Sequence, residues 1–93
     1  MNMQSIYKYH ITDGKSQFDF PKGAKILTAQ NQGGQLMLWV IVNPEEKERE
    51  KRRILIVGTG WEMSEDLTSH KYISTVQMGD IVVHVFENLD KDN

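Results

Sequence analysis

Histidine is the side chain in this sequence that is best suited to acid–base chemistry or to metal binding at neutral pH. The chain has three of them, His10, His70 and His84. No two stand two or four residues apart, the spacings that bring two imidazoles onto one metal ion, and the chain has no cysteine. His84 shares one face of an apolar strand with Val82 and Phe86, so it fits either a hydrogen-bonded core or interface group or the wall of a ligand pocket. The sequence therefore predicts no metal site.

Serine, aspartate and histidine side chains gather in one short segment, which is the composition of a nucleophilic catalytic set. The residues are Ser64, Asp66, Ser69 and His70. All four lie on one expected loop, without the strand–turn–helix elbow that exposes a catalytic serine. We therefore expect no enzymatic activity and no cofactor.

The run from Ile54 to Trp61 reads ILIVGTGW, and an apolar strand that leads into Gly-x-Gly is how many nucleotide-binding folds begin. The dinucleotide fingerprint needs a third glycine where this chain has Met63, and three acidic residues follow the glycines. No strand–helix–strand unit follows, and the Gly-Lys-Ser/Thr of a phosphate-binding loop is absent. The sequence thus predicts neither nucleotide motif, and Gly58 and Gly60 are expected to turn the chain sharply with positive φ.

Two further groups are suited to binding rather than to catalysis. Trp61 begins a polar loop of about ten residues, where it fits a cap on the core, a stacking surface for a planar ligand or an anchor for a partner protein. Arg52 and Arg53 end the charge run over residues 44–53, which we expect to be a solvated loop between two strands. Their guanidinium groups could reach an anionic ligand.

Short β-rich runs bounded by Gly, Pro, Asn and Asp must position all of these residues. The strands are expected at 5–11, 17–20, 25–30, 36–43, 53–57, 71–78 and 81–87, with hairpin turns at 31–35 and 79–80. Because the connections are short, neighbouring strands should run antiparallel. The sequence predicts an all-β fold, a small, mostly antiparallel sandwich or barrel of about seven strands.

Two of these strands, 36–43 and 53–57, are apolar on both faces, and such strands need cover on each side. One cover is the core of the domain, and we expect the other to be a second sheet or a partner subunit. The chain of 93 residues makes a single domain over 1–93, with a frayed tail at 88–93. So small a domain without disulfides is marginally stable alone, which favours a homo-oligomer.

The overall charge excludes further partners. The chain has 11 basic and 13 acidic residues and a formal net charge of −2, so no nucleic-acid partner is expected. Its longest apolar run, Leu36 to Val42, is far shorter than the roughly 18 residues of a membrane span, and residues 1–5 do not resemble a secretory signal. We expect a cytoplasmic protein with no membrane partner.

Five segments taken together resemble a family of short bacteriophage and prophage proteins of unknown function. They read IYKYHI, PKGAKIL, LWVIVNP, ILIVGTG and YISTVQMGDIVVHVFE, and they extend from Ile6 to Glu87. Members of that family often have His directly after Gly-Thr-Gly, where this chain has Trp61, which puts any role of that His in doubt. The resemblance implies a viral origin and action in the host bacterial cytoplasm, and it implies no established chemistry.

Accessory phage proteins without a catalytic set often bind a host immune signal or a host protein, so two readings remain. In the first, a homo-oligomer sequesters a nucleotide-derived signal of host defence, with aromatic rings stacking the base and basic groups and backbone N–H groups meeting phosphates. Its expected ligand-binding residues are Gly58, Thr59, Gly60, Trp61, Arg53, His84, Tyr7 and Lys8. In the second, an interaction module inhibits a host protein through an exposed apolar patch. A minor virion component is a weaker third reading.

Overall fold

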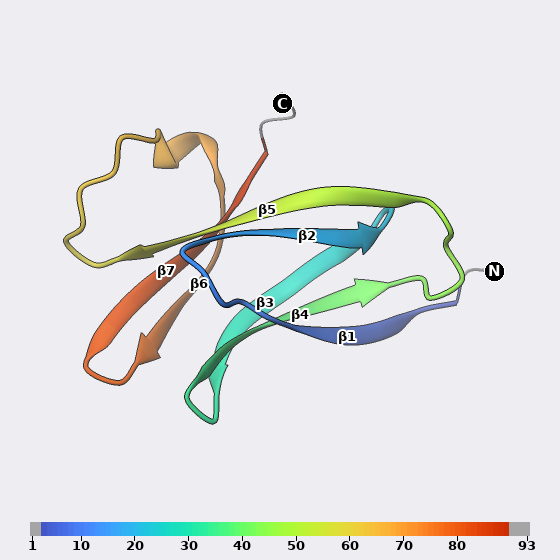
Figure 1. The fold of residues 1–93 in the computed structure, drawn as a ribbon, viewed down its shortest axis with the longest axis horizontal. Helices are drawn as coiled ribbons and strands as arrows, with labels where there is room; N and C mark the ends of the chain where they lie inside the picture. Colours follow the sequence, from blue (N-terminus) through green and yellow to red (C-terminus); the bar gives the residue numbers. More distant parts are fainter. Residues whose placement is uncertain (1–2, 90–93) are drawn as a thin grey trace.

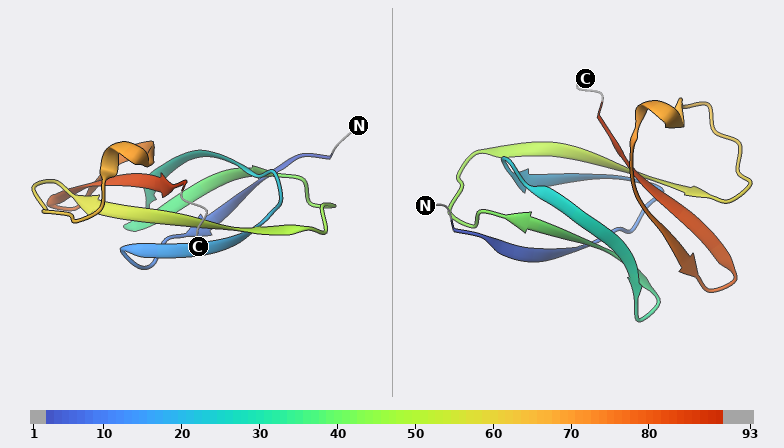
Figure 2. Two further views of the ribbon diagram at one scale, coloured as in Figure 1. Left: turned by 90° about the horizontal axis from the view of Figure 1, so that it is seen from above. Right: turned by 180° about the vertical axis from the view of Figure 1, so that it is seen from behind.

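The computed structural model describes residues 3–89, which form two antiparallel sheets packed face to face (Figure 1). One sheet has the strand order β1-β4-β3 and the other β2-β5-β7-β6. The strands are β1 (Ser5–His10), β2 (Lys15–Pro21), β3 (Lys25–Gln32), β4 (Gln35–Val42), β5 (Arg49–Gly58), β6 (Lys71–Met78) and β7 (Ile81–Asn88). The expected all-β, mostly antiparallel sandwich of seven strands is therefore confirmed, and Figure 2 shows how flat the molecule is.

The core fills the space between the sheets because alternate side chains of each strand point to the same face. On β4, Leu36, Leu38, Val40 and Val42 are buried, while the residues between them are half-buried on the outer face. The opposite sheet contributes buried side chains that include Phe20, Ile54 and Val85. Each fully buried side chain of this size stabilises the fold by about 1.5–3 kcal/mol relative to an exposed one.

The first two strands lie in different sheets, although they follow each other in the sequence. β1 pairs with β4 and β2 pairs with β5, so the short connection between β1 and β2 crosses from one sheet to the other. Aromatic rings join the two strands across the core, with the Tyr9 ring centroid 5.6 Å from that of Phe18 and 4.8 Å from that of Phe20. This cluster closes one side of the sandwich.

The other side of the sandwich is closed by side chains that link β3 to β6. The Oγ of Ser74 accepts a hydrogen bond from the Ala29 backbone N–H at 2.9 Å and lies 3.0 Å from the Oγ1 of Thr28. Asn31 Nδ2 donates to the Gln77 carbonyl at 3.0 Å. β3 and β6 belong to different sheets and are not paired through their backbones, so the sheets meet at this seam through side chains. Each of the two strands shifts register against its own sheet neighbour close to these contacts.

The expected solvated loop over the charge run 44–53 is wrong for its second half. β5 begins at Arg49, and residues 49–52 pair with Phe18–Pro21 of β2. The charged residues can form a strand because their side chains alternate between the two faces, where ion pairs and water accommodate them. On the other side of β5, β7 extends to Asn88, the first residue of the expected frayed tail, and Asn88 pairs with Arg53. Most of the expected frayed tail, residues 90–93, lies outside the described residues.

The second cover of β5 differs from the expected sheet or partner subunit. Leu55 and Val57 alternate with core residues along β5 and so point to the outer face, yet both are buried. The connection between β5 and β6 supplies residues to this face: the His70 ring is 6.4 Å from that of Phe86, and His70 lines a recess together with Leu55. The chain's own segment 59–70 therefore covers this side of β5.

That segment contains one turn of 3₁₀ helix, η1 (Leu67–Ser69), which starts at the capping residue Asp66. The Asp66 carboxylate accepts hydrogen bonds from the Thr68 backbone N–H at 3.1 Å and from the Thr68 hydroxyl at 2.6 Å. These bonds lower the pKa of the Asp66 carboxyl. Among residues 3–89, no helix is long and apolar enough to span a membrane.

Candidate functional site

The Gly-Thr-Gly-Trp segment forms a tight turn at the end of β5. The Trp61 backbone N–H donates to the Gly58 carbonyl at 3.1 Å, and Gly60 has the expected positive φ, of 87°. Gly58 does not have a positive φ, so that expectation is wrong for the first glycine. The first glycine is instead needed for close approach, because a Cβ on Gly58 would lie 2.7 Å from the indole Nε1 of Trp61. The indole packs against the turn while 59% of the residue remains exposed.

His84 is held in a chain of hydroxyl contacts on the outer face of the second sheet. Its Nε2 lies 2.7 Å from the Oγ1 of Thr59, and its Nδ1 lies 3.0 Å from the Oγ1 of Thr75. The Tyr72 hydroxyl extends the chain, 2.7 Å from the Oγ1 of Thr75. Both ring nitrogens therefore already have partners within the protein, and the contacts fix the imidazole between β6 and the Gly-Thr-Gly turn.

The segment that gathers Ser64, Asp66, Ser69 and His70 is arranged as a capped turn. The Ser69 hydroxyl donates to the Asp66 carbonyl at 2.8 Å, and the Nδ1 of His70 lies 3.1 Å from the same carbonyl. Because a carbonyl only accepts, Nδ1 must carry a proton and cannot act as the base for Ser69. The Nε2 of His70 is buried without a hydrogen-bond partner in the described part of the chain.

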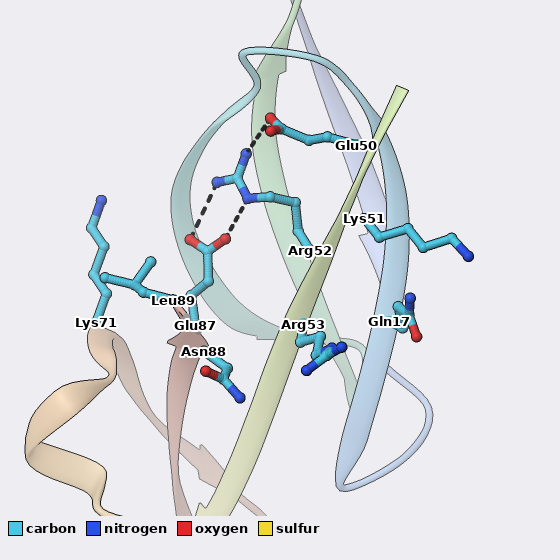
Figure 3. Close-up of a pocket in the computed structure, with 9 residues that line it drawn as sticks. All are labelled: Gln17, Glu50, Lys51, Arg52, Arg53, Lys71, Glu87, Asn88 and Leu89. Carbon is cyan, nitrogen blue, oxygen red and sulfur yellow. Dashed lines mark hydrogen bonds and ion pairs between the residues drawn. The ribbon is translucent and has the colours of Figure 1, made fainter. Parts of the chain in front are cut away.

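A recess of about 450 Å³ lies where β7 ends beside β5 (Figure 3). Here Arg52 makes a bidentate ion pair with Glu87, a residue only 4% exposed. The same guanidinium donates to the Ala24 carbonyl at 2.9 Å and to Glu50 at 3.3 Å. The hydrogen bonds to Glu87 raise the pKa of Arg52, so the arginine stays charged. The Arg52 guanidinium is thus engaged within the fold, and its contact with an anionic ligand stays a prediction.

Three other cations line this recess, which we call the β5 notch: Lys51, Arg53 and Lys71. Lys51 and Arg53 point away from the face that carries Arg52, and Lys71 comes from the start of β6 (Figure 3). Within residues 3–89, none of these three side chains has a hydrogen-bond or ion-pair partner, whereas both acidic groups of the notch contact Arg52. The notch thus holds unpaired positive charge in a chain whose formal net charge is −2.

Arg53 also lines a second recess, of about 360 Å³, on the outer face of the same sheet. Gln17 and Asn88 border both recesses, so the two hollows adjoin at Arg53. The second recess is bounded by Glu65 and His70 from the covering segment. Arg53 is therefore a predicted ligand-binding residue that lines both recesses.

The predicted ligand-binding residues do not form one site within a protomer. Gly58, Thr59, Gly60, Trp61 and His84 gather at one end of β5, and Arg53 lies five residues before that end. Tyr7 and Lys8 lie on β1 in the other sheet, where Lys8 Nζ donates to Gln32 at 2.8 Å. A site containing all eight residues would require a second subunit.

Comparison with known families matches residues 3–93 to a domain of unknown function, DUF7352. The chain belongs to the DUF7352 family. No curated protein and no solved structure gave a match. Family membership is consistent with the expected uncharacterised family, and it assigns no activity.

Sequence reasoning missed several residues of these hollows. Lys51 and Lys71 were not singled out, although the alternation of side chains along β5 would have placed Lys51 beside Arg53 on one face. Thr75 was also missed, yet the two-residue turn at Gly79-Asp80 fixes the register that sets Thr75 opposite His84. No cluster of three or more His, Cys, Asp or Glu that could hold a metal ion occurs among residues 3–89.

Proposed function

We propose that this protein is a non-enzymatic binding protein that sequesters an anionic, nucleotide-type small molecule at the β5 notch. In the phage setting that the sequence resemblance implies, the ligand is a nucleotide-derived signal of host immunity. The observation that carries the proposal is the group of unpaired cations Lys51, Arg53 and Lys71 around a hollow of about 450 Å³. Pockets for small ligands commonly measure 300–1,000 Å³.

The ion pair between Arg52 and Glu87, which lines the notch, supports a binding site there. Arg52 and Glu87 contact each other and hold the ends of β5 and β7 together, so the outer cations extend from a rigid base. Phosphate groups would meet Arg53 and Lys71, and the side-chain amides of Gln17 and Asn88 are hydrogen-bonding groups at the same rim. The adjoining recess offers room for the uncharged part of such a ligand.

Self-association belongs to the same proposal. The outer face of the β1-β4-β3 sheet carries Met37, Trp39 and Ile41 on its central strand, flanked by Ile6 and Leu27, which are exposed. Burial of this apolar face against a second subunit would stabilise so small a domain.

Native mass spectrometry of the protein purified from bacteria with active nucleotide-based defences tests the proposal. We expect masses at multiples of 10.8 kDa with a small molecule that is lost on denaturation. In vitro, thermal unfolding is followed with ADP, cyclic ADP-ribose and 3′,5′-cyclic AMP, with pyrophosphate as a charge-only probe. A ligand at 100 times its Kd should stabilise the fold by about 2.7 kcal/mol.

Arg53→Gln should abolish that stabilisation, because it removes the cation shared by both recesses. Lys47→Gln is the matched control, since it removes one positive charge from an exposed loop outside the notch. Equal responses in the two variants, or the same effect with pyrophosphate as with every nucleotide, would contradict a nucleotide-type site. A bare monomer without an adduct would contradict the oligomer.

A second candidate function, inhibition of a host protein through an exposed apolar patch, is favoured by one observation. Trp61 and Ile81 are both more than half exposed and line the same small recess, far along β5 from the notch.

A further inference from the structure

A third recess, of about 260 Å³, opens between the two sheets at the turn end of the sandwich, and we call it the end recess. Buried side chains of both sheets form its floor, among them Ile11, Leu36 and Val83. The β3–β4 and β6–β7 turns lie at this end of the molecule (Figures 1 and 2). The recess is below the 300–1,000 Å³ of ordinary small-molecule pockets, so its size suits one large apolar side chain.

Two large apolar side chains stand at the mouth of the end recess. Trp61 is 59% exposed and Ile81 is 53% exposed, and both line the hollow. Contact between the indole and Gly58 holds Trp61 in place, so little side-chain entropy remains to be lost when a partner binds. Tryptophan at the edge of a preformed apolar pocket is the usual composition of a binding hot spot.

The surroundings of this mouth are acidic. Asp13 lines the recess, and Glu62 and Asp80 are exposed directly beside Trp61 and Ile81 in the sequence. Among the lining residues whose side chains the structure describes, none of those at the end recess is basic, in contrast to the β5 notch. A partner that fits must therefore combine an apolar anchor with positive charge around it.

We propose that the end recess binds a basic peptide segment of a partner protein, which inserts one large apolar side chain against Trp61 and Ile81 and pairs flanking Lys or Arg residues with Asp13, Glu62 and Asp80. Burial of the apolar anchor would supply most of the affinity. The charged groups would orient the peptide and raise its association rate. This site is separate from the β5 notch, so the protein would have a small-molecule site and a protein-binding site on opposite stretches of β5.

Trp61 fluorescence in a Trp39→Phe background tests the proposal, because Trp61 is then the only indole in the chain. The probe is the peptide acetyl-Lys-Lys-Leu-Phe-Lys-Lys-amide. Two control peptides replace Leu-Phe by Ser-Ser or all four Lys by Glu. We expect a saturable change in emission with the first peptide and none with the controls, and a weaker affinity at 1 M salt because exposed charges are then screened.

Matched variants locate the binding. Ile81→Ala, followed in the same fluorescence assay, should weaken the affinity at least tenfold, whereas Leu27→Ala, which truncates an exposed apolar side chain on the other sheet, should leave it unchanged. For Trp61→Ala, which removes the reporter, peptide binding is followed by the amide NMR signals of Gly14, Gly60 and Gly79. Unchanged dispersion of the remaining signals shows that each variant is folded.

Three results would overturn the proposal. The first is equal binding of the Ser-Ser peptide, which would mean that charge alone attracts the peptide. The second is binding that survives both Trp61→Ala and Ile81→Ala. The third is a concentration-dependent change in emission without any peptide, which would assign the recess to a second copy of this chain. Thermal unfolding of the same variants with added nucleotide tests the β5 notch separately from the end recess.

Discussion

At the scale of single residues, a contact between Gly58 and Trp61 sets the position of a tryptophan that is 59% exposed. We predict that Gly58→Ala displaces the indole, because the added Cβ would lie 2.7 Å from its Nε1. In a Trp39→Phe background, the emission of Trp61 should shift and its near-ultraviolet circular dichroism should decrease. Gly14→Ala is the control, since a Cβ there meets no atom within 4 Å. Identical spectra for both variants would contradict the contact.

The ion pair between Arg52 and Glu87 should contribute strongly to stability when only one partner is removed. Glu87→Gln removes the charged partner of two guanidinium hydrogen bonds, while Glu50 and the Ala24 carbonyl still contact Arg52, so we expect a loss of about 1.5–3 kcal/mol in the free energy of unfolding. Glu48→Gln, which breaks the exposed pair with Lys22, should cost less than about 1 kcal/mol. Urea denaturation measures both, and similar midpoints would show that the buried pair is not special.

If Glu87→Gln does not fold, the double variant Arg52→Met with Glu87→Leu can still measure the contribution of the ion pair to stability. An apolar pair of similar size removes both charges together, and such replacements are often neutral or stabilising. We therefore expect the double variant to be more stable than either single variant. A double variant that is less stable than both single variants would show that an apolar pair does not pack in place of the ion pair.

The capping carboxylate of Asp66 gives a prediction with a defined pH dependence. Its hydrogen bonds with Thr68 hold its folded-state pKa below the ordinary value of 3.8. A lowered folded-state pKa means that the stabilisation is present above pH 3.8 and is lost as the pH falls through the folded-state pKa. The difference in stability between the natural chain and Asp66→Ala should therefore shrink on acidification. A difference that does not change with pH would contradict this role of the capping carboxylate.

At the scale of elements, the seam between β3 and β6 rests on the Ser74 hydroxyl. Ser74→Ala leaves the Ala29 backbone N–H buried without a partner, which typically costs about 1–3 kcal/mol. Thermal unfolding should show the loss, whereas Ser64→Ala, at an exposed serine, should have little effect. A Ser74→Ala variant with the stability of the natural chain would show that water or another group replaces the hydroxyl.

The strands could be predicted from the sequence because their signals are local. Alternation of apolar residues located β1, β6 and β7, and the Gly79-Asp80 turn determined how the last two pair. The first half of β5 was missed because its charged residues suggested a loop, while its pairing with β2 is a tertiary effect. The cover of Leu55 by segment 59–70 was missed for the same reason, since no local pattern shows which face a polar loop will cross.

The candidate sites could be predicted only in part. Arg53 and Trp61 were singled out by residue type, and both line recesses in the structure. Their separation follows from the extended course of β5 between them, which the expected strand at 53–57 already implied. The engagement of Arg52 by Glu87 depends on two strands meeting, and no spacing in the sequence encodes it.

At the scale of the whole molecule, β5 separates two surfaces of opposite charge. Arg53 at the notch and Gly58 beside the end recess are five residues apart on the strand, or roughly 17 Å at the usual rise per residue. We predict that a nucleotide and the basic peptide bind independently. Their stabilising free energies should add to within about 0.5 kcal/mol, as is usual for sites this far apart. Mutual exclusion in a calorimetric titration would show that the two ligands share one site.

The placement of β1 and β2 in different sheets has a consequence for how the chain is made. Each of them pairs with a strand that a ribosome produces only after two further strands, so the N-terminal strands must wait without partners during synthesis. The β6–β7 hairpin, in contrast, pairs with itself as soon as it emerges. Topologies dominated by distant pairings fold slowly, and waiting strands are exposed to aggregation. Slower elongation over the codons for β4 and β5 would lengthen the time for which β1 and β2 are unpaired. We therefore expect it to raise the yield of folded protein less than co-expression of a chaperone that binds extended chains.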